Sequence, residues 1–382
     1  MKISFHVFTV MVFLTGLFLG VLRLAYPVIE INSYSYVLYS LIVFGVVKSI
    51  MNYVSGHLSD FIGRKKVLLL GWLAALPISV FGLFRSSEVL ILLTAFLGVN
   101  QALTWTTTVT SQIDLTGKKR AGLAAGFNET FGYLGVALGN FIAGILIESE
   151  ISPYLFLLFT SLLALSIGSS VRETKPSQGV TSRLSLTSPL LIGMAGLLEK
   201  FVDAFFWVLV PLYLYLEKQS PLEIATIVTI YSMSWASLQT PMGHISDVRG
   251  RTGIILIGFT LMSIGVASFP LNYYLSALIS GIGMAMVYPT LIALVNDDAD
   301  IAVRGRALGV YRLLRDGGYA IAGLFFFFTY HTPSWSIVVV VMCQILAMIT
   351  ISWRSRIRIS QKIDLLKSKL FSKGNGNYRG WS

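Results

Sequence analysis

Nine ionisable residues of this sequence lie inside long apolar stretches, where charge is costly and usually serves a function. Side chains of these types bind and release protons, or hold charged solutes. The carboxyl groups and the bases occur in similar numbers, so they can also neutralise one another. The nine residues are Arg23, Lys48, Glu129, Glu199, Lys200, Asp203, Arg312, Arg315 and Asp316.

Two of the carboxyl groups lie four residues apart in one apolar stretch. Glu199 and Asp203 therefore share a face if that stretch is helical. A membrane-embedded carboxyl group that exchanges a proton is what a proton-coupled carrier needs, and Asp203 lies near the middle of its stretch. The alternative is that the nearby base Lys200, or bases from elsewhere in the fold, neutralise these acids permanently.

A second charged group lies near the C-terminus. Arg312 and Asp316 are also four apart, and their spacing predicts an ion pair. Together with Arg315 they would tie one part of the fold to another. The alternative is an anion-binding site, to which Lys48 and Arg23 would add further positive charge.

The composition predicts that these residues lie in a membrane. The chain is 55% hydrophobic and 12% charged, whereas soluble domains carry roughly twice that charged fraction. Apolar stretches of ~20 residues recur, each long enough to cross a bilayer. The single cysteine excludes an internal disulfide. The sequence has neither an ATPase-type phosphate loop nor a His/Cys cluster, so we expect no ATP-driven pump, enzyme, cofactor or metal site.

Twelve membrane spans can be marked. They are Phe5–Val28, Tyr34–Ser55, Val67–Leu83, Val89–Ile113, Ala121–Ile147, Pro153–Ser170, Pro189–Leu216, Ile224–Met242, Gly253–Phe269, Tyr273–Val295, Ala307–Thr329 and Pro333–Trp353. The even-numbered loops hold thirteen Lys and Arg residues and the odd-numbered loops two. This asymmetry predicts that both termini are cytoplasmic.

The chain divides into two halves that repeat one another. Gly-His-Leu-Ser-Asp-x-x-Gly-Arg begins at Gly56, and Gly-His-Ile-Ser-Asp-x-x-Gly-Arg begins 187 residues later at Gly243. Gly-Tyr pairs at Gly132 and Gly318 recur with an offset of 186 residues. We therefore predict an all-α membrane protein of two pseudo-twofold-related six-helix bundles, residues 1–171 and 189–353, with a cytoplasmic linker at 172–188 and a basic tail at 354–382.

The repeated loops also suggest their own structure. Glycines allow a tight turn between two helices, and Arg64 can pair with an acid near the end of the fourth span, where Asp114 lies. The first loop resembles the signature loop of the major facilitator superfamily through Gly56, Asp60, Gly63, Arg64 and Lys65. The second copy keeps Gly243, Asp247, Gly250 and Arg251.

The resemblance implies a transporter that works by alternating access. It further implies that the loops form a cytoplasmic latch, which holds the two halves together when the outer side is open. Asp114 would belong to this latch, and Arg312, Arg315 and Asp316 would form its interdomain part. We expect Asp60→Asn to lower transport without lowering expression.

In that superfamily spans one, four, seven and ten line the central cavity, which places Arg23 and Asp203 first among the coupling or substrate residues. Lys48, Glu129 and Glu199 remain candidates, and polar and aromatic candidates on the cavity spans are Asn100, Gln101, Trp105, Trp207 and Tyr288. The glycines after Glu129 resemble the fifth-span motif of the superfamily's antiporters. The proline of that motif is missing, and so is the antiporters' fourth-span arginine.

We therefore expect proton-coupled efflux of a small amphipathic organic compound. An organic-anion or metabolite carrier is the alternative, and a transport-inactive sensor on the same fold is a third possibility. The partners would be the substrate and protons or another coupling ion. The basic tail, with eight Lys or Arg and one Asp from residue 354 onward, would bind anionic lipid headgroups rather than nucleic acid. We expect a monomer in a prokaryotic plasma membrane.

Overall fold

A computed structural model describes residues 2–29, 34–84, 87–117, 121–174, 186–299 and 304–374. The described residues form helices and short connecting turns, with no strand among them. The first half contains α1 (Lys2–Ile29), α2 (Tyr34–Ile62), α3 (Arg64–Leu73), α4 (Ala75–Phe81), η2 (Gly82–Phe84), α5 (Ser87–Thr116), α6 (Ala121–Glu148) and α7 (Pro153–Ser169). The second half contains α8 (Thr187–Ala204), η4 (Phe205–Leu209), α9 (Val210–Leu216), α10 (Pro221–Arg249), α11 (Arg251–Ala267), α12 (Tyr273–Asp298), α13 (Arg304–Thr329) and α14 (Pro333–Gly374).

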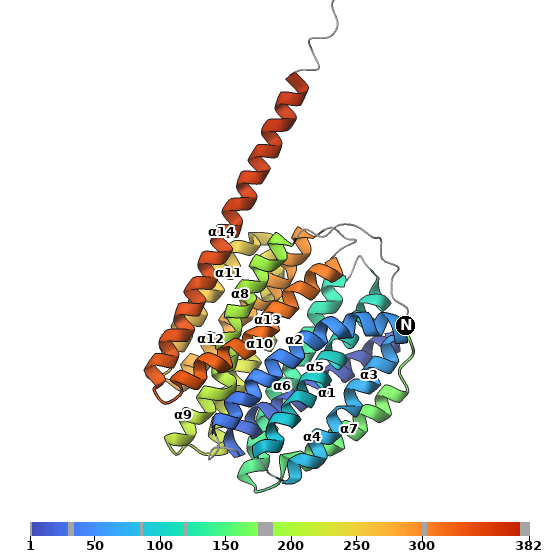
Figure 1. Cartoon of the computed structure of the whole chain (residues 1–382), viewed down its shortest axis with the longest axis vertical. Helices are drawn as coiled ribbons and strands as arrows, with labels where there is room; N and C mark the ends of the chain where they lie inside the picture. Colours follow the sequence, from blue (N-terminus) through green and yellow to red (C-terminus); the bar gives the residue numbers. More distant parts are fainter. Residues whose placement is uncertain are drawn as a thin grey trace, which may run out of the picture.

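Within the described residues these helices make twelve rods, one over each predicted span. Two rods are broken, because α3, α4 and η2 follow one another in one rod and a π-helical turn, η4, joins α8 to α9 in another. Seven helical segments are long and apolar enough to cross a membrane, and two shorter apolar helices are Pro153–Ser169 and Arg251–Ala267. That all twelve rods cross the membrane stays a prediction. The last helix is longer than predicted and continues past its bundle (Figure 1).

Both repeated loops make the same turn between two helices. Gly63 and Gly250 separate α2 from α3 and α10 from α11, with φ angles of 100° and 93°. Side chains rarely adopt these angles, so glycine is needed at both places. The two turns therefore match in structure as well as in sequence.

Glycines also set how closely the rods pack. A Cβ atom added at Gly16 of α1 would lie 1.8 Å from the backbone oxygen of Gly132 on α6, and one at Gly139 would lie 2.3 Å from the oxygen of Leu17. Only helices whose backbones touch have such geometry. The glycines of the fifth span therefore lie where α6 packs closely on α1.

The two halves form separate groups of helices, which meet along α2 with α13 and along α6 with α10 (Figure 1). We call the end that carries residues 56–66 and 243–251 the loop end, and the opposite end the far end. Toward the far end the halves touch closely, since a Cβ at Gly45 would lie 2.4 Å from Ala320 and one at Gly144 would lie 2.2 Å from Ala225.

Toward the loop end no glycine contact of this kind is seen at Gly56, Gly126 and Gly309, where an added Cβ atom would meet nothing within 4 Å. The described residues therefore show the two halves in close contact toward the far end.

Candidate substrate and coupling site

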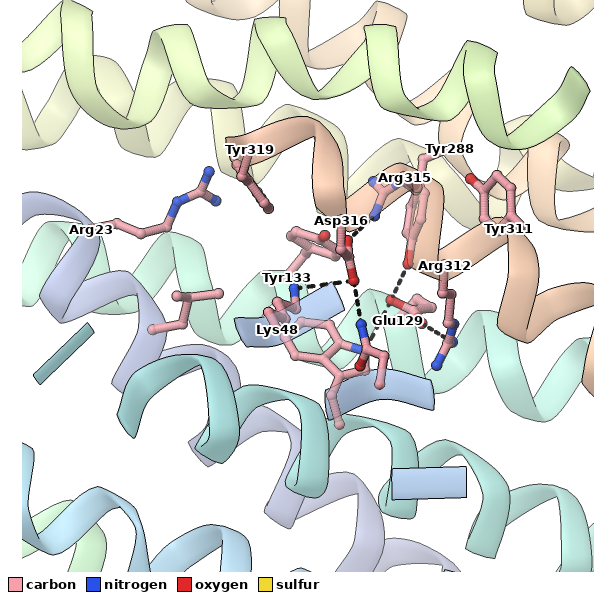
Figure 2. A pocket seen from close by; sticks show the side chains of 13 residues that line it. Arg23, Lys48, Glu129, Tyr133, Tyr288, Tyr311, Arg312, Arg315, Asp316 and Tyr319 are labelled. Carbon is pink, nitrogen blue, oxygen red and sulfur yellow. Dashed lines mark hydrogen bonds and ion pairs between the residues drawn. The ribbon is translucent and has the colours of Figure 1, made fainter. Parts of the chain in front are cut away.

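A cavity lies between the two bundles, with space for only about two or three water molecules. Helices from both halves line it, which places it where a ligand would contact both bundles (Figure 2). We call it the main cavity. Its lining residues are Leu19, Arg23, Lys48, Asn52, Trp105, Glu129, Tyr133, Tyr288, Tyr311, Arg312, Arg315, Asp316 and Tyr319.

Asp203 of α8 is held from both bundles. Arg23 of α1 donates through Nη2 to Oδ1 of Asp203 and, at 3.3 Å, to its backbone oxygen. Lys200 Nζ lies 2.8 Å from Oδ2, and the hydroxyl of Tyr319 donates to the same oxygen. Asp203 and Lys200 are fully buried. This buried ion pair joins the first half to the second.

Glu199 has a separate cation. Arg315 of α13 binds it with two hydrogen bonds, from Nε at 2.7 Å and from Nη2 at 2.9 Å. The Arg315 guanidinium also lies 3.9 Å from the ring centroid of Tyr288. Glu199 and Asp203 share a helix face as predicted, but each is neutralised by different bases, so they do not act as a pair of free carboxyl groups.

Asp316 connects α13 to α2. Asn52 Nδ2 donates to its Oδ2 at 2.5 Å, and Lys48 Nζ lies 3.8 Å from the same oxygen (Figure 2). On the other side Arg315 Nη1 lies 3.5 Å from Oδ1. Lys48 therefore has only a long contact with an acid that other groups share.

The predicted ion pair between Arg312 and Asp316 is wrong. Arg312 reaches across to α6, where its Nη2 lies 3.2 Å from Oε1 of Glu129. Two further donors, Trp105 Nε1 at 3.1 Å and the Tyr288 hydroxyl at 2.8 Å, bind Oε2 of Glu129. The spacing on α13 correctly gave the shared face, but the opposite bundle offers a closer acid.

These contacts leave one positive charge in excess. The buried network holds five cations and four carboxylates, if all are ionised, and three of its ion pairs cross from one bundle to the other. Charges this deep in a membrane protein are stable only when they are paired or solvated. The surplus lies closest to Lys48, whose pairing distance is the longest.

Two predicted cavity residues lie elsewhere. Asn100 donates to the backbone oxygen of Gly71 at 2.9 Å, and Gln101 donates to that of Thr15 at 3.2 Å. Both are fully buried between helices of the first half and line neither described cavity. Amides on an apolar span can serve packing as well as binding, and here they cross-link α5 to α3 and α1.

The other aromatic candidates do lie beside the charges. Trp105 and Tyr288 line the main cavity, and Trp207 lies under the Arg23 guanidinium at 4.9 Å. Sequence reasoning missed Asn52, Tyr133, Tyr311 and Tyr319. The repeated Gly-Tyr pairs were a usable signal, since Tyr133 and Tyr319 belong to them.

The first repeated loop is bound within its own bundle. Arg64 Nε lies 3.2 Å from Oδ2 of Asp114, which confirms the predicted pair, and Arg64 also donates to Ser59. Glu173, just after α7, accepts from the backbone amides of Arg64 at 2.6 Å and Lys65 at 3.3 Å. The side chain of Asp60 lies outside the described residues.

The second loop repeats this arrangement. Arg251 pairs with Asp247, lies 2.9 Å from Asp297 and donates to Ser246 at 2.8 Å. The side chains of Arg304 and Arg306, the two bases at the start of α13, are outside the described part of the chain. Arg312 and Asp316 bind groups of the opposite bundle, Glu129 and Lys48, whereas Arg315 binds Glu199 of its own bundle. Their role in a latch stays a prediction.

The Glu173 contact yields a testable prediction. Its carboxylate accepts the free amides at the start of α3, where negative charge is also favoured by the helix dipole. Glu173→Ala should therefore destabilise the protein by about 1–2 kcal/mol. Thermal unfolding in detergent measures this, with Glu150→Ala, an exposed acid at the far end, as the matched control. Equal melting temperatures for the two variants would show that the hydrogen bonds from the α3 amides to Glu173 contribute nothing to stability.

The fold and the cavity define a two-bundle membrane transporter. Comparison with known proteins gives its family: residues 8–192 and again 192–365 match the model described as the Major Facilitator Superfamily. The chain therefore belongs to the Major Facilitator Superfamily and is a multi-pass membrane transporter. The two consecutive matches also agree with the internal repeat.

Among solved structures the chain resembles one titled "Crystal structure of D-xylose-proton symporter". The TM-score is 0.72 at 14% sequence identity, and the match covers 91% of this chain and 97% of that one. At this identity the similarity supports the fold. No curated protein sequence matches the chain.

Proposed function

We propose that this chain is a proton-coupled secondary transporter that moves a small organic anion by alternating access. The observation that carries the proposal is the buried ion network with one surplus positive charge, which crosses between the bundles around the main cavity. An anionic group that entered beside Lys48 would neutralise this surplus. A neutral solute would leave it unpaired.

Asp203 is the proposed coupling residue. Its protonation would remove the charge that Arg23 binds and so weaken the tie between α1 and α8. Proton binding would thereby favour separation of the bundles at the far end, which is the change that alternating access requires. The similarity to a structure titled as a proton symporter supports protons as the coupling ion.

Efflux of an amphipathic compound, the first expectation from sequence, is the second candidate. The observation in its favour is the aromatic part of the cavity wall, which holds five rings: Trp105, Tyr133, Tyr288, Tyr311 and Tyr319. Aromatic walls with a few polar groups suit such ligands. Four of the five rings also carry a hydroxyl, so the wall suits a polar solute equally well.

Proteoliposomes loaded with a pH-sensitive dye test both candidates. Pools of small organic anions should drive proton movement, and amphipathic cations and neutral drugs should not. Proton flux with amphipathic compounds alone would establish the second candidate instead. No flux with any pool, from protein whose folding is verified, would favour a transport-inactive sensor.

Lys48→Gln should raise the KM for the transported anion at least about tenfold, equivalent to ~1.4 kcal/mol of lost binding, and change kcat less. The reason is that Lys48 is the least paired cation of the cavity. Lys66→Gln, a base exposed at the loop end, is the matched control. An unchanged KM for Lys48→Gln would place the anion elsewhere or remove the anion proposal.

We further propose that the loop end faces the cytoplasm of a prokaryotic cell, on the strength of the positive charges in its loops. In the opposite conformation the repeated loops would act as the latch. Spin labels at Phe61 and Val248, which are 89% and 74% exposed, should then move together when the far end opens.

The division into bundles, linker and tail, the lipid-binding role of the tail and the monomeric state remain proposals.

A further inference from the structure

A second, smaller cavity lies behind Arg23, on the side away from the main cavity's other charges. We call it the inner chamber. Its wall includes Arg23 and Asn140 from the first half and Phe206, Trp207 and Tyr231 from the second. It has room for about one water molecule. Arg23 lines both cavities and so separates them.

Arg23 has more donors than the protein accepts. A guanidinium carries five N–H groups on three nitrogen atoms. Among the described residues only Nη2 of Arg23 donates a hydrogen bond, to the carboxylate and backbone oxygens of Asp203. The side chain is 5% exposed, so Nε and Nη1 depend on water in the two cavities that Arg23 lines. Buried donors of this kind normally have a partner.

Two residues of the chamber wall each have a polar atom without a partner. The Tyr231 hydroxyl and Oδ1 of Asn140 make no hydrogen bond, although their residues are only 1% and 3% exposed. The other atom of the Asn140 amide, Nδ2, donates to Ser232 at 3.1 Å. Both unpartnered atoms belong to residues of the chamber wall.

These atoms define the chemistry of an occupant. It must accept from the Arg23 guanidinium and donate to the amide oxygen of Asn140, while the Tyr231 hydroxyl can do either. A halide ion cannot donate, a protonated oxyanion such as bicarbonate is too large for the space, and a metal cation would be repelled by Arg23. A water molecule meets all three requirements and fits the space.

The π-helical turn η4 shapes the chamber. It presents Phe206, which stacks on Tyr231 with centroids 4.3 Å apart, and Trp207, which lies under Arg23. At the end of this turn the Tyr34 hydroxyl of the first half donates to the backbone oxygen of Val208. π-Turns often occur at functional sites, and here one places two rings that close the chamber.

We propose that the inner chamber binds one ordered water molecule through Arg23, Tyr231 and Asn140, and that this water remains as a partner of Arg23 when the guanidinium leaves Asp203. The second part rests on the proposed alternating-access cycle. Without this water, breaking the ion pair would leave the guanidinium with no partner on the chamber side. With it, the pair can open at lower cost.

Radiolytic hydroxyl-radical labelling in ¹⁸O water, on the full chain in lipid nanodiscs, tests the site itself. Bound water is the source of the radical, so Tyr231 should gain ¹⁸O despite its burial. We expect its rate to exceed that of Phe259 at least tenfold. Phe259 is equally buried and lines neither described cavity. Equal rates for the two rings would show a dry chamber and overturn the proposal.

Asn140→Leu removes the amide oxygen and fills the chamber, so it should lower labelling of Tyr231 at least tenfold. Asn128→Leu is the matched control, because Asn128 is a fully buried amide of the same helix, also with an unpartnered oxygen, outside the chamber wall. Labelling of Tyr288 in the main cavity should stay unchanged in both and verifies folding. Undiminished labelling of Tyr231 in Asn140→Leu would remove Asn140 from the site.

The effect on conformation is measured separately, by electron-spin distances between labels at Phe61 and Val248. Asn140→Leu should reduce the population with the loop end closed at least fivefold relative to Asn128→Leu, since Arg23 then loses its replacement partner. An unchanged population, with the labelling result intact, would leave the water site standing and reject its role in opening. Neither readout requires a substrate, so both remain valid if the proposed transport activity is wrong.

Discussion

Asp203→Asn is expected to lower proton-coupled flux at least about 100-fold, an effect equivalent to roughly 2.7 kcal/mol in the rate-limiting step. The substitution removes the negative charge that binds Arg23 and Lys200, both of which are buried. It also removes the only carboxylate that pairs with α1 in the described structure. Flux in proteoliposomes with a pH dye inside is the measurement.

A loss of stability must be separated from a loss of coupling. Breaking one side of a buried ion pair costs about 3–5 kcal/mol, because a charge is left without a partner. The double variant Arg23→Gln with Asp203→Asn removes this pair but leaves Lys200 without its carboxylate, so it should recover only part of that loss. Its transport should stay low if Asp203 couples protons to movement.

Three outcomes are therefore distinct. If the double variant regains both stability and coupled flux, the pair is structural and Asp203 does not carry the proton. Substrate flux without proton movement in Asp203→Asn would confirm the coupling role, since the solute would still bind. Normal proton-coupled flux in Asp203→Asn would reject the proposal outright.

The sequence predicted the architecture well, because the signals for it are local and repeated. Apolar length marks each rod, and the glycines of the two loops identify turns that only a positive φ angle can make. The Arg64–Asp114 pair also followed, although it joins residues 50 apart, because both lie at helix ends on the same side of the first bundle.

The candidate site was harder to predict, because the residues that pair in it come from different bundles. The spacing of Arg312 and Asp316 fixes their shared face, but not which acid or base lies opposite each of them. In the structure Arg312 pairs with Glu129, and Asp316 lies near Lys48. Asn100 and Gln101 looked like binding residues, yet they bind backbone oxygens between helices. Pairing across a cavity depends on how two rigid bundles are docked, which periodicity does not encode.

The π-helical turn η4 could not be predicted from its own residues either. Nothing in the composition of residues 205–209 marks an interruption, since Phe, Trp, Val and Leu are ordinary residues of a membrane span. The turn is accompanied by a hydrogen bond from Tyr34 to the Val208 oxygen, and by one from Arg23 to the Asp203 oxygen just before it. Both donors come from the other bundle, so the interruption belongs to the interface rather than to the segment.

The second large effect is expected at the crossing of α1 and α6. Gly16→Ala should destabilise the protein by about 3 kcal/mol or more, since the new methyl carbon would lie 1.8 Å from a backbone oxygen of Gly132. Overpacking against flexible side chains typically costs 1–3 kcal/mol, and a helix backbone yields less readily than a side chain. The yield of folded protein and its melting temperature in detergent report the change.

Gly126→Ala on α6 is the matched control. A Cβ there would meet nothing within 4 Å, so the substitution should leave stability unchanged or raise it slightly through helix propensity. Comparable melting temperatures for Gly16→Ala and Gly126→Ala would show that α1 and α6 can separate without cost. The close crossing would then not be what holds the first bundle together.

The internal repeat extends this prediction to the second bundle. A Cβ at Gly318, the counterpart of Gly132, would lie 2.4 Å from the backbone oxygen of Leu197, where α13 crosses α8. Gly318→Ala should therefore destabilise the protein much as Gly16→Ala does. These two crossings fix α1 against α6 and α8 against α13, and α1 and α8 carry Arg23 and Asp203. Rigid bundles would allow the buried ion pairs that cross between the halves to break together when the halves separate.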